Sequence, residues 1–327
     1  MRLLSLISIS LICLLLLGCE QPVKPISQST HAAVATYDAD ISNDGSAALI
    51  ASVNHQAGFW DIENDVLLYN WQQGSAEEEI LAVDISSDGL FAVTASHTTF
   101  ALWSTETGKN LGFYNLPESD LRDIAIADGG RLVVMGLGNG TVIHVNLDTG
   151  RRLEFLAHGE AINSLVISPN GRYVLSGGND YRAILWDSQT GQPIHTWPHQ
   201  SRVILVAMTS DARYAFSSGN KADAYIWDLN SGQRVSALDL EKRQYVLSSA
   251  RFSADGNELL TGAPSKQLTL WQVSNGKALQ KLSVSARNQR RPSGAIVYAV
   301  GFTESGDLLS ESSAGLGERW ARNIKTQ

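Results

Sequence analysis

One aromatic position recurs along the chain at nearly constant spacing. Tryptophan fills it six times, and a valine stands at the matching place between the second and third of them. The seven positions are Trp60, Trp103, Val145, Trp186, Trp227, Trp271 and Trp320, at intervals of 43, 42, 41, 41, 44 and 49 residues. A period of this length is typical of chains built from stacked supersecondary units, each of which buries its apolar surface against its neighbours.

Two turn signals keep the same period and predict short antiparallel strands. Glycine permits the positive φ that such tight turns need. The first set is Asp44-Gly45, Asp88-Gly89, Gly129-Gly130, Asn170-Gly171, Asp255-Gly256 and Ser305-Gly306, with Asp211-Ala212 as a departure. The second set follows the aromatic position by four and five residues, at Thr107-Gly108, Thr149-Gly150, Thr190-Gly191, Ser231-Gly232 and Asn275-Gly276.

The clearest unit, residues 158–187, predicts strands over 161–167, 173–176 and 182–186 from its alternation of apolar and polar residues. With Trp-Asp pairs at 60–61, 186–187 and 227–228, the pattern resembles the WD40 repeat family over about residues 32–325. The resemblance implies an all-β fold, a seven-bladed β-propeller of four-stranded antiparallel blades. Because only seven residues follow the last tryptophan, we expect an N-terminal strand near 26–32 to complete the last blade.

The resemblance also implies a buried hydrogen-bond network in each complete unit. It joins a histidine before the inner strand, a hydroxyl on the second strand, an aspartate in the next turn and the tryptophan. The matching residues are His158, Ser176, Asp180 and Trp186. In the fifth unit Lys221 stands where the aspartate is expected. A hydrolase site is the alternative interpretation, which we disfavour because no nucleophile elbow accompanies these residues.

The rest of the chain shows no motif for metal or cofactor chemistry. Its seven histidines form no H-x-H or HExxH pair. Both cysteines lie within the first 19 residues, so the body has neither a disulfide framework nor a zinc cluster. We therefore expect no metal and no cofactor, and we expect Trp71 and Trp197 to pack between blades.

The N-terminus predicts export and lipidation. Arg2 precedes 15 largely apolar residues, which are too few for a comfortable membrane span but suit a signal peptide. The following Leu16-Leu17-Gly18-Cys19 resembles the lipobox of bacterial lipoproteins, which implies cleavage before Cys19 and acylation of that residue. An uncleaved signal anchor is the alternative. The expected boundaries are a signal peptide at 1–18, a lipidated tether with a possible closing strand at 19–31, and the propeller at 32–327.

The charge of the chain limits which classes of partner it can bind. The net charge of −8, without a long basic run, argues against nucleic acid. Two charged loops are candidate sites for protein partners, and both should lie on one face of the ring. They contain Arg287, Arg290 and Arg291, and Glu77, Glu78 and Glu79. The alternative is that both are simply solvated loops.

These features predict a non-enzymatic scaffold that binds protein partners in the bacterial cell envelope. Glu20, rather than an aspartate, implies the outer membrane facing the periplasm under enteric-type sorting. Two alternatives stay open: an enzyme or small-ligand binder acting at the central channel, and an accessory lipoprotein in outer-membrane protein assembly. Converging histidines and carboxylates in the channel would favour the enzyme, whereas apolar or Ser/Thr filling would favour the scaffold.

Overall fold

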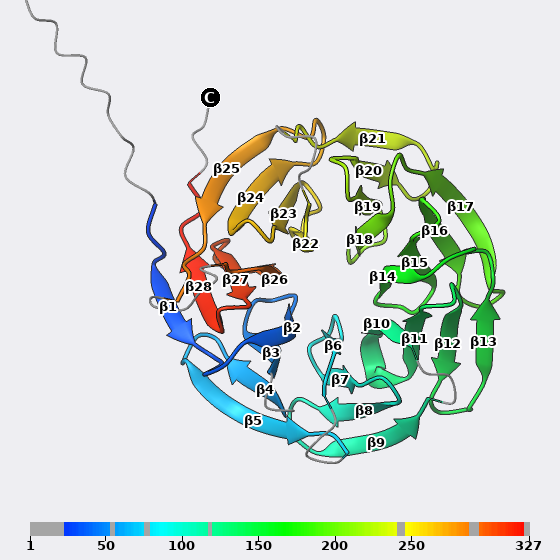
Figure 1. The fold of residues 1–327 in the computed structure, drawn as a ribbon, viewed down its shortest axis with the longest axis horizontal. Helices are drawn as coiled ribbons and strands as arrows, with labels where there is room; N and C mark the ends of the chain where they lie inside the picture. Colours follow the sequence, from blue (N-terminus) through cyan, green and yellow to red (C-terminus); the bar gives the residue numbers. More distant parts are fainter. Residues whose placement is uncertain are drawn as a thin grey trace, which may run out of the picture.

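The chain folds into a ring of seven blades around a central channel (Figure 1). The computed structural model describes residues 23–52, 56–74, 79–116, 120–240, 246–287 and 294–323. In these residues, 28 strands form seven antiparallel sheets of four strands each. The helical content of the same residues is one 3₁₀ turn, η1 (Asp128–Gly130). The predicted all-β, seven-bladed propeller is confirmed.

The four strands of each blade are ordered from the channel to the rim. The inner strands are β2 (Thr36–Ile41), β6 (Ala82–Ile85), β10 (Leu121–Ile126), β14 (Ile162–Ile167), β18 (Val203–Met208), β22 (Ser249–Phe252) and β26 (Val297–Phe302). The second strands are β3 (Ala47–Ser52), β7 (Phe91–Ala95), β11 (Leu132–Leu137), β15 (Tyr173–Gly178), β19 (Tyr214–Gly219), β23 (Glu258–Gly262) and β27 (Leu308–Ser312). The third strands are β4 (Gln56–Asp61), β8 (Thr99–Ser104), β12 (Val142–Asn146), β16 (Arg182–Asp187), β20 (Ala224–Asp228), β24 (Gln267–Gln272) and β28 (Leu316–Trp320). The outer strands of blades one to six are β5 (Val66–Gln72), β9 (Asn110–Asn115), β13 (Arg152–Phe155), β17 (Gln192–Pro198), β21 (Arg234–Ala237) and β25 (Ala278–Ser283).

Two faces of the ring follow from this topology. The turns between first and second strands form what we call the turn face, and Gly45 and Gly171 take φ values of +72° and +70° there. At the one departure from the pattern, Ala212 adopts a φ of +55° in the same turn. The segments that enter the inner strands, and the turns between second and third strands, form the opposite face, which we call the loop face.

Aromatic side chains pack each blade onto the next. Trp71 of β5 stacks on Trp103 of blade two with 5.0 Å between ring centroids, and its indole Nε1 donates to the carbonyl of Gly108. Trp197 of β17 repeats the arrangement on Trp227 at 5.1 Å. Both predicted inter-blade positions are confirmed. The recurring tryptophan is therefore a contact between neighbouring repeats, which explains why it keeps the period of the chain.

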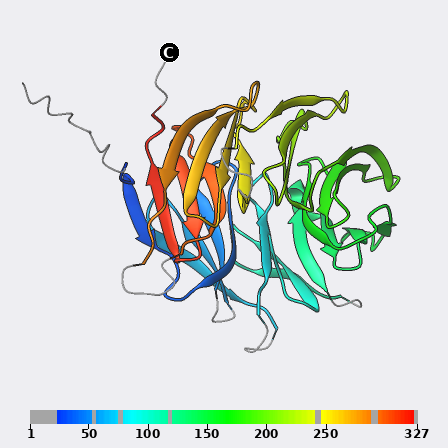
Figure 2. The ribbon, with the colours of Figure 1, turned by 45° about the horizontal axis from the view of Figure 1, so that its top comes forward.

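The N-terminal segment closes the ring. Strand β1 (Ser27–Thr30) pairs with β28 as the outer strand of blade seven, with Ser27 opposite Arg319 and Thr30 opposite Leu316 (Figure 2). The amide of Gln28 also donates to buried Glu318 at 2.8 Å. The predicted closing strand is confirmed.

Side chains after β1 join blade seven to blade one. His31 is buried and stacks on Trp60, with Nδ1 at 2.8 Å from a Glu311 carboxylate oxygen and Nε2 at 3.4 Å from Asp65. Burial opposes a charge on this imidazole, but the two carboxylates outweigh burial and raise the pKa of His31. The closing strand is thus held by charge-assisted contacts as well as by backbone hydrogen bonds.

Removal of β1 should destabilise the whole ring. A mature form that begins at His31 leaves the edge of β28 unpaired, and we expect its melting temperature to fall by roughly 10 °C and oligomers to form. A form that begins at Val23 keeps β1 and is the matched control. Thermal unfolding and size-exclusion chromatography measure both effects, and equal stability of the two forms would show that β1 is dispensable.

Candidate functional site in the central channel

The inner strand of each blade is an edge strand, so one row of its backbone N–H groups faces away from its own sheet. Unpaired buried N–H groups are costly, and polar side chains of the preceding blade satisfy several of them. Asp40 of blade one accepts from the amide of Ile85 in blade two at 3.0 Å. Asp84 of blade two accepts from the amide of Ile126 in blade three at 2.8 Å.

A second layer of acceptors lies two residues earlier on the inner strands. Asp38 accepts from the amide of Val83 at 2.9 Å, and Asp123 accepts from the amide of Leu165 at 2.7 Å. In blade four the hydroxyl of Ser164 takes the same role toward the amide of Val206, at 3.2 Å. Side chains in blades one to four therefore connect each inner strand to the next one around the channel.

Sequence reasoning missed these channel residues, although a signal for them is present. Asp40 and Asp84 each lie five residues before the glycine of the first turn, and Asp38 and Asp123 lie seven residues before it. Their repeat spacing relative to Gly45, Gly89 and Gly130 marks equivalent positions.

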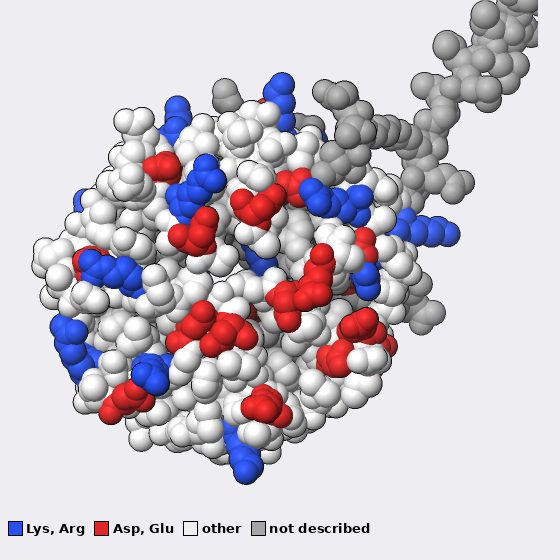
Figure 3. All heavy atoms as spheres, turned by 180° about the vertical axis from the view of Figure 1, so that it is seen from behind, with Lys and Arg blue, Asp and Glu red and all other residues white. Residues whose placement is uncertain are grey.

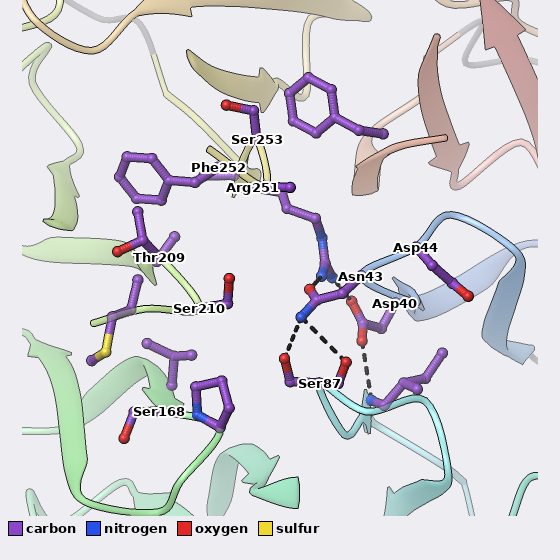
Figure 4. Close-up of a pocket in the computed structure, with 18 of the residues that line it drawn as sticks. Asp40, Asn43, Asp44, Ser87, Ser168, Thr209, Ser210, Arg251, Phe252 and Ser253 are labelled. Atoms are coloured by element: carbon purple, nitrogen blue, oxygen red, sulfur yellow. Dashed lines mark hydrogen bonds and ion pairs between the residues drawn. The ribbon is translucent and has the colours of Figure 1, made fainter. Parts of the chain in front are cut away.

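Arg251 links three blades across the channel (Figure 4). From β22 of blade six, its Nε donates to the carbonyl of Val300 in blade seven at 3.1 Å. Its two Nη groups reach blade one, where they donate to Asp40 and to Asn43, each at 2.5 Å. The guanidinium fork suits this role because it offers several donors in fixed directions. Arg251 thus spans blade seven from the inside.

The carboxyl groups of Asp38, Asp84 and Asp123 are hard to ionise. Burial raises the pKa of Asp123 to about 7. Burial also raises the pKa of Asp38 and of Asp84 well above the usual range, and the neighbouring carboxylates Asp123 and Asp40, respectively, add to the effect. The protonated form of these three carboxyl groups is therefore more favoured than it is in an exposed aspartate.

A hollow of about 520 Å³ opens from the channel. It is lined by turn-face residues that include Asn43, Asp44 and Ser253, together with apolar Phe252 and Met208 (Figure 4). Figure 3 shows acidic side chains gathered around a central hollow on one face of the ring. No histidine is among the described residues that line the hollow. Within the same described part of the chain, no group of three His, Cys, Asp or Glu side chains is arranged to hold a metal ion.

The four residues of the network expected in blade four are connected by contacts within hydrogen-bond distance. His158 Nε2 lies 2.8 Å from Ser176 Oγ, and His158 Nδ1 lies 2.9 Å from Asp180. The indole of Trp186 donates to the same Ser176 oxygen at 2.7 Å. Ser176 is fully buried, so no substrate can approach this Ser–His–Asp arrangement, and its role is structural.

Blade five corrects the sequence prediction. Lys221 was expected to replace the aspartate, but Asp223, two residues later, supplies the carboxylate at 3.3 Å from His199 Nδ1. Asp223 directly follows Ala222, whose φ of +61° lies in the left-handed region. This local turn lets the Asp223 carboxylate reach His199. His199 Nε2 contacts Ser217 at 2.8 Å, and Ser217 accepts from Trp227. The network of blade five is therefore complete.

Other blades keep the tryptophan–hydroxyl bond alone or with a substitute for the histidine. Trp103 donates to Thr94 at 2.9 Å, and Thr94 donates to Gln73, which takes the place of the histidine. Trp271 and Trp320 donate to hydroxyls at 2.8 and 3.3 Å. In blade one, by contrast, the buried Nε1 of Trp60 has no hydrogen-bond partner among the described residues.

The charged loops are only partly described. Arg290, Arg291, Glu77 and Glu78 lie outside the described residues, as does Cys19. Arg287 donates to the carbonyls of Ala32 and Ala33, so its guanidinium ties the segment after β1 to the ring. Glu79 is exposed and accepts from the hydroxyl of Tyr37 at 3.0 Å. The structure thus gives Arg287 an internal partner.

Asp223→Ala should destabilise the protein by about 2–4 kcal/mol, because it leaves buried His199 and Ser201 without their acceptor. Although burial opposes ionisation of Asp223, hydrogen bonds from His199 and Ser201 outweigh it and lower its pKa to about 2. Lys221→Ala, the position expected from the repeat, should change stability little. Urea unfolding of both variants measures the difference, and an equal loss in the two would contradict the assignment.

Asp123→Asn should stabilise the protein at pH 8 by about 1–3 kcal/mol. The folded-state pKa of Asp123 lies above its unfolded value, so stability is lost as pH rises toward about 7. Asparagine keeps an acceptor for Leu165 and carries no charge. Asp44→Asn is the control of opposite sign, because hydrogen bonds from Ser42 and Ser46 outweigh burial and lower the pKa of Asp44. Unfolding curves at pH 5 and pH 8 test both, and lower stability of Asp123→Asn at pH 8 would refute the prediction.

Comparison with known proteins finds one matching family model and a solved structure with the same fold. The family model described as WD domain, G-beta repeat matches residues 150–187. A chain of the structure named "Crystal Structure of Mitotic Checkpoint Complex" superposes with a TM-score of 0.76 and 16% identity, over 99% of this chain and 99% of that chain. At that identity the likeness concerns the fold alone. The comparison with curated proteins found no match.

Among the described residues, no helix is long and apolar enough to cross a membrane.

One repeat matches the family model, and the other six share its period, its four-stranded blade and, in most cases, its tryptophan. The chain is therefore a seven-bladed β-propeller, and its fourth blade carries the sequence of a WD40 repeat.

Proposed function

We propose that the protein is a non-enzymatic scaffold that binds protein partners in the bacterial cell envelope. Acyl chains on Cys19 would hold it to a membrane, with the ring facing the periplasm from the outer membrane. One observation supports the scaffold role: the side chains that could act in catalysis form hydrogen bonds that hold the fold together. The two Ser–His–Asp arrangements are buried under tryptophans, and the channel carboxylates cap backbone amides.

The fold supports the same role. A closed ring presents its loops on a rigid body, so a partner meets a preformed surface and little ordering entropy is lost. Propellers of WD40 repeats typically bind protein partners, and the superposed solved chain belongs to a structure named as a complex. The loop face is the surface we assign to partners, because its segments differ most in length from blade to blade.

Binding of a small ligand in the hollow of the channel is the second candidate function. Its volume falls within the range of ligand pockets, and both polar and apolar side chains line it. Its strongest donor, Arg251, is however committed to three internal acceptors. A ligand would have to break blade-to-blade contacts to use it.

Photo-crosslinking in cells tests which face binds a partner. A photoreactive phenylalanine derivative replaces Tyr181 on the loop face or Leu90 on the turn face, which are 50% and 53% exposed. We expect a discrete protein adduct from position 181 and none from position 90. Mass spectrometry of the adduct then shows whether the partner belongs to outer-membrane protein assembly.

Adducts from position 90 alone would place the partner on the turn face and contradict the loop-face assignment. Absence of adducts from both positions would favour the channel ligand. Acylation is tested separately, by palmitate labelling of the protein and of the Cys19→Ser variant, which should lose the label.

A further inference from the structure

The rim of the ring carries an apolar stripe on one arc. Outer strand β5 exposes three consecutive apolar side chains, Val66, Leu67 and Leu68, at 48%, 42% and 46%. The next outer strand, β9, exposes Leu111 and Phe113. By contrast, the outer strands β21 and β25 of blades five and six expose no large apolar side chain. Single exposed apolar residues are ordinary, whereas a run of them on a strand edge is not.

These outer strands also lack the residues that protect strand edges. An unpaired edge is usually blunted by charge or by proline. Strands β13, β21 and β25 contain Arg152, Arg234 and Lys281, and β17 contains two prolines. Neither β5 (VLLYNWQ) nor β9 (NLGFYN) contains a charged residue or a proline. Exposed apolar side chains and unprotected edges therefore coincide on the same two blades.

The N-terminal end of the described chain also exposes apolar side chains, and polar β1 separates them from the stripe. Val23 and Ile26, just before β1, are 50% and 56% exposed. After β1, His31 meets Asp65 immediately before β5. The indole of Trp71 then joins β5 to the turn before β9. The segment before β1, β5 and β9 thus follow one another along the rim (Figure 1).

We infer that this stripe, centred on β5 and β9, rests on the bilayer to which the protein is anchored, so that the ring stands with one edge against the membrane. The inference relies on the proposed acylation of Cys19. Only three residues separate Cys19 from Val23, and the four Cα–Cα steps between them reach roughly 14 Å when fully extended. A tether this short keeps β1 close to the lipid surface, and the end of β1 leads through His31 to the start of β5.

Charge beside the stripe selects the headgroup. Asp61, Glu63 and Asp65 surround the turn before β5, and Glu106 lies in the turn before β9. Anionic headgroups would repel these carboxylates. The stripe therefore suits zwitterionic lipid, and contact should weaken as the anionic fraction of the bilayer rises.

The test uses the mature acylated protein with one added thiol. Because Cys19 would be blocked by lipid, Leu67→Cys supplies a single site for an environment-sensitive fluorophore. Ile194→Cys on β17 is the matched control, since Ile194 is 41% exposed and Leu67 is 42% exposed, both on outer strands. The proteins are reconstituted on phosphatidylcholine vesicles that contain a bromolipid quencher, and flotation measures anchoring.

We expect at least threefold stronger quenching at position 67 than at position 194, with a smaller ratio on vesicles rich in phosphatidylglycerol. A second label at Phe113→Cys should follow position 67. Failure to float would refute the anchor and the membrane contact together. Flotation with equal or absent quenching at 67 and 194 would refute the membrane contact alone, as would an in-cell crosslink from position 67 to a protein strand instead of lipid.

Discussion

The pairing of β1 with β28 is the contact on which the rest of the ring depends. Each blade buries its two faces against its neighbours, so a propeller has no stable end until the last blade meets the first. Here the contact joins side chains 290 residues apart, as between Gln28 and Glu318. The entropy cost of closing so long a loop grows only slowly with its length. The contacts of one completed four-stranded blade are therefore enough to offset it.

The same junction is reinforced from both sides. At the rim, His31 anchors the segment that follows β1 to the carboxylate of Glu311, and Arg287 donates to two backbone carbonyls of the same segment. In the channel, Arg251 reaches from blade six past blade seven to Asp40 of blade one. Side-chain contacts therefore concentrate where the chain is discontinuous, and blades one to four instead rely on the repeated acceptors of their inner strands.

Sequence periodicity was sufficient to predict the blades because the residues that set the period are inter-blade contacts. Trp103 and Gly108, for example, both meet the preceding blade. It was insufficient where a different local turn delivers the same chemical group: Asp223 reaches His199 from two residues beyond the expected position. It also missed Asp38 and Asp123, because an aspartate on an alternating strand looks solvated, and only closure of the ring shows which amide it faces.

The closing strand has a consequence for the time course of folding. Strand β1 is among the first segments to be synthesised, and β28 is the last strand, so their pairing waits for nearly the whole chain. At ordinary rates of translation, synthesis of the residues between the two strands alone takes about 15–60 s. Throughout that interval β1 has no partner, and an apolar strand in that position would invite aggregation. Its sequence, Ser-Gln-Ser-Thr, contains no apolar residue, so the segment that must wait longest is also one that water solvates well.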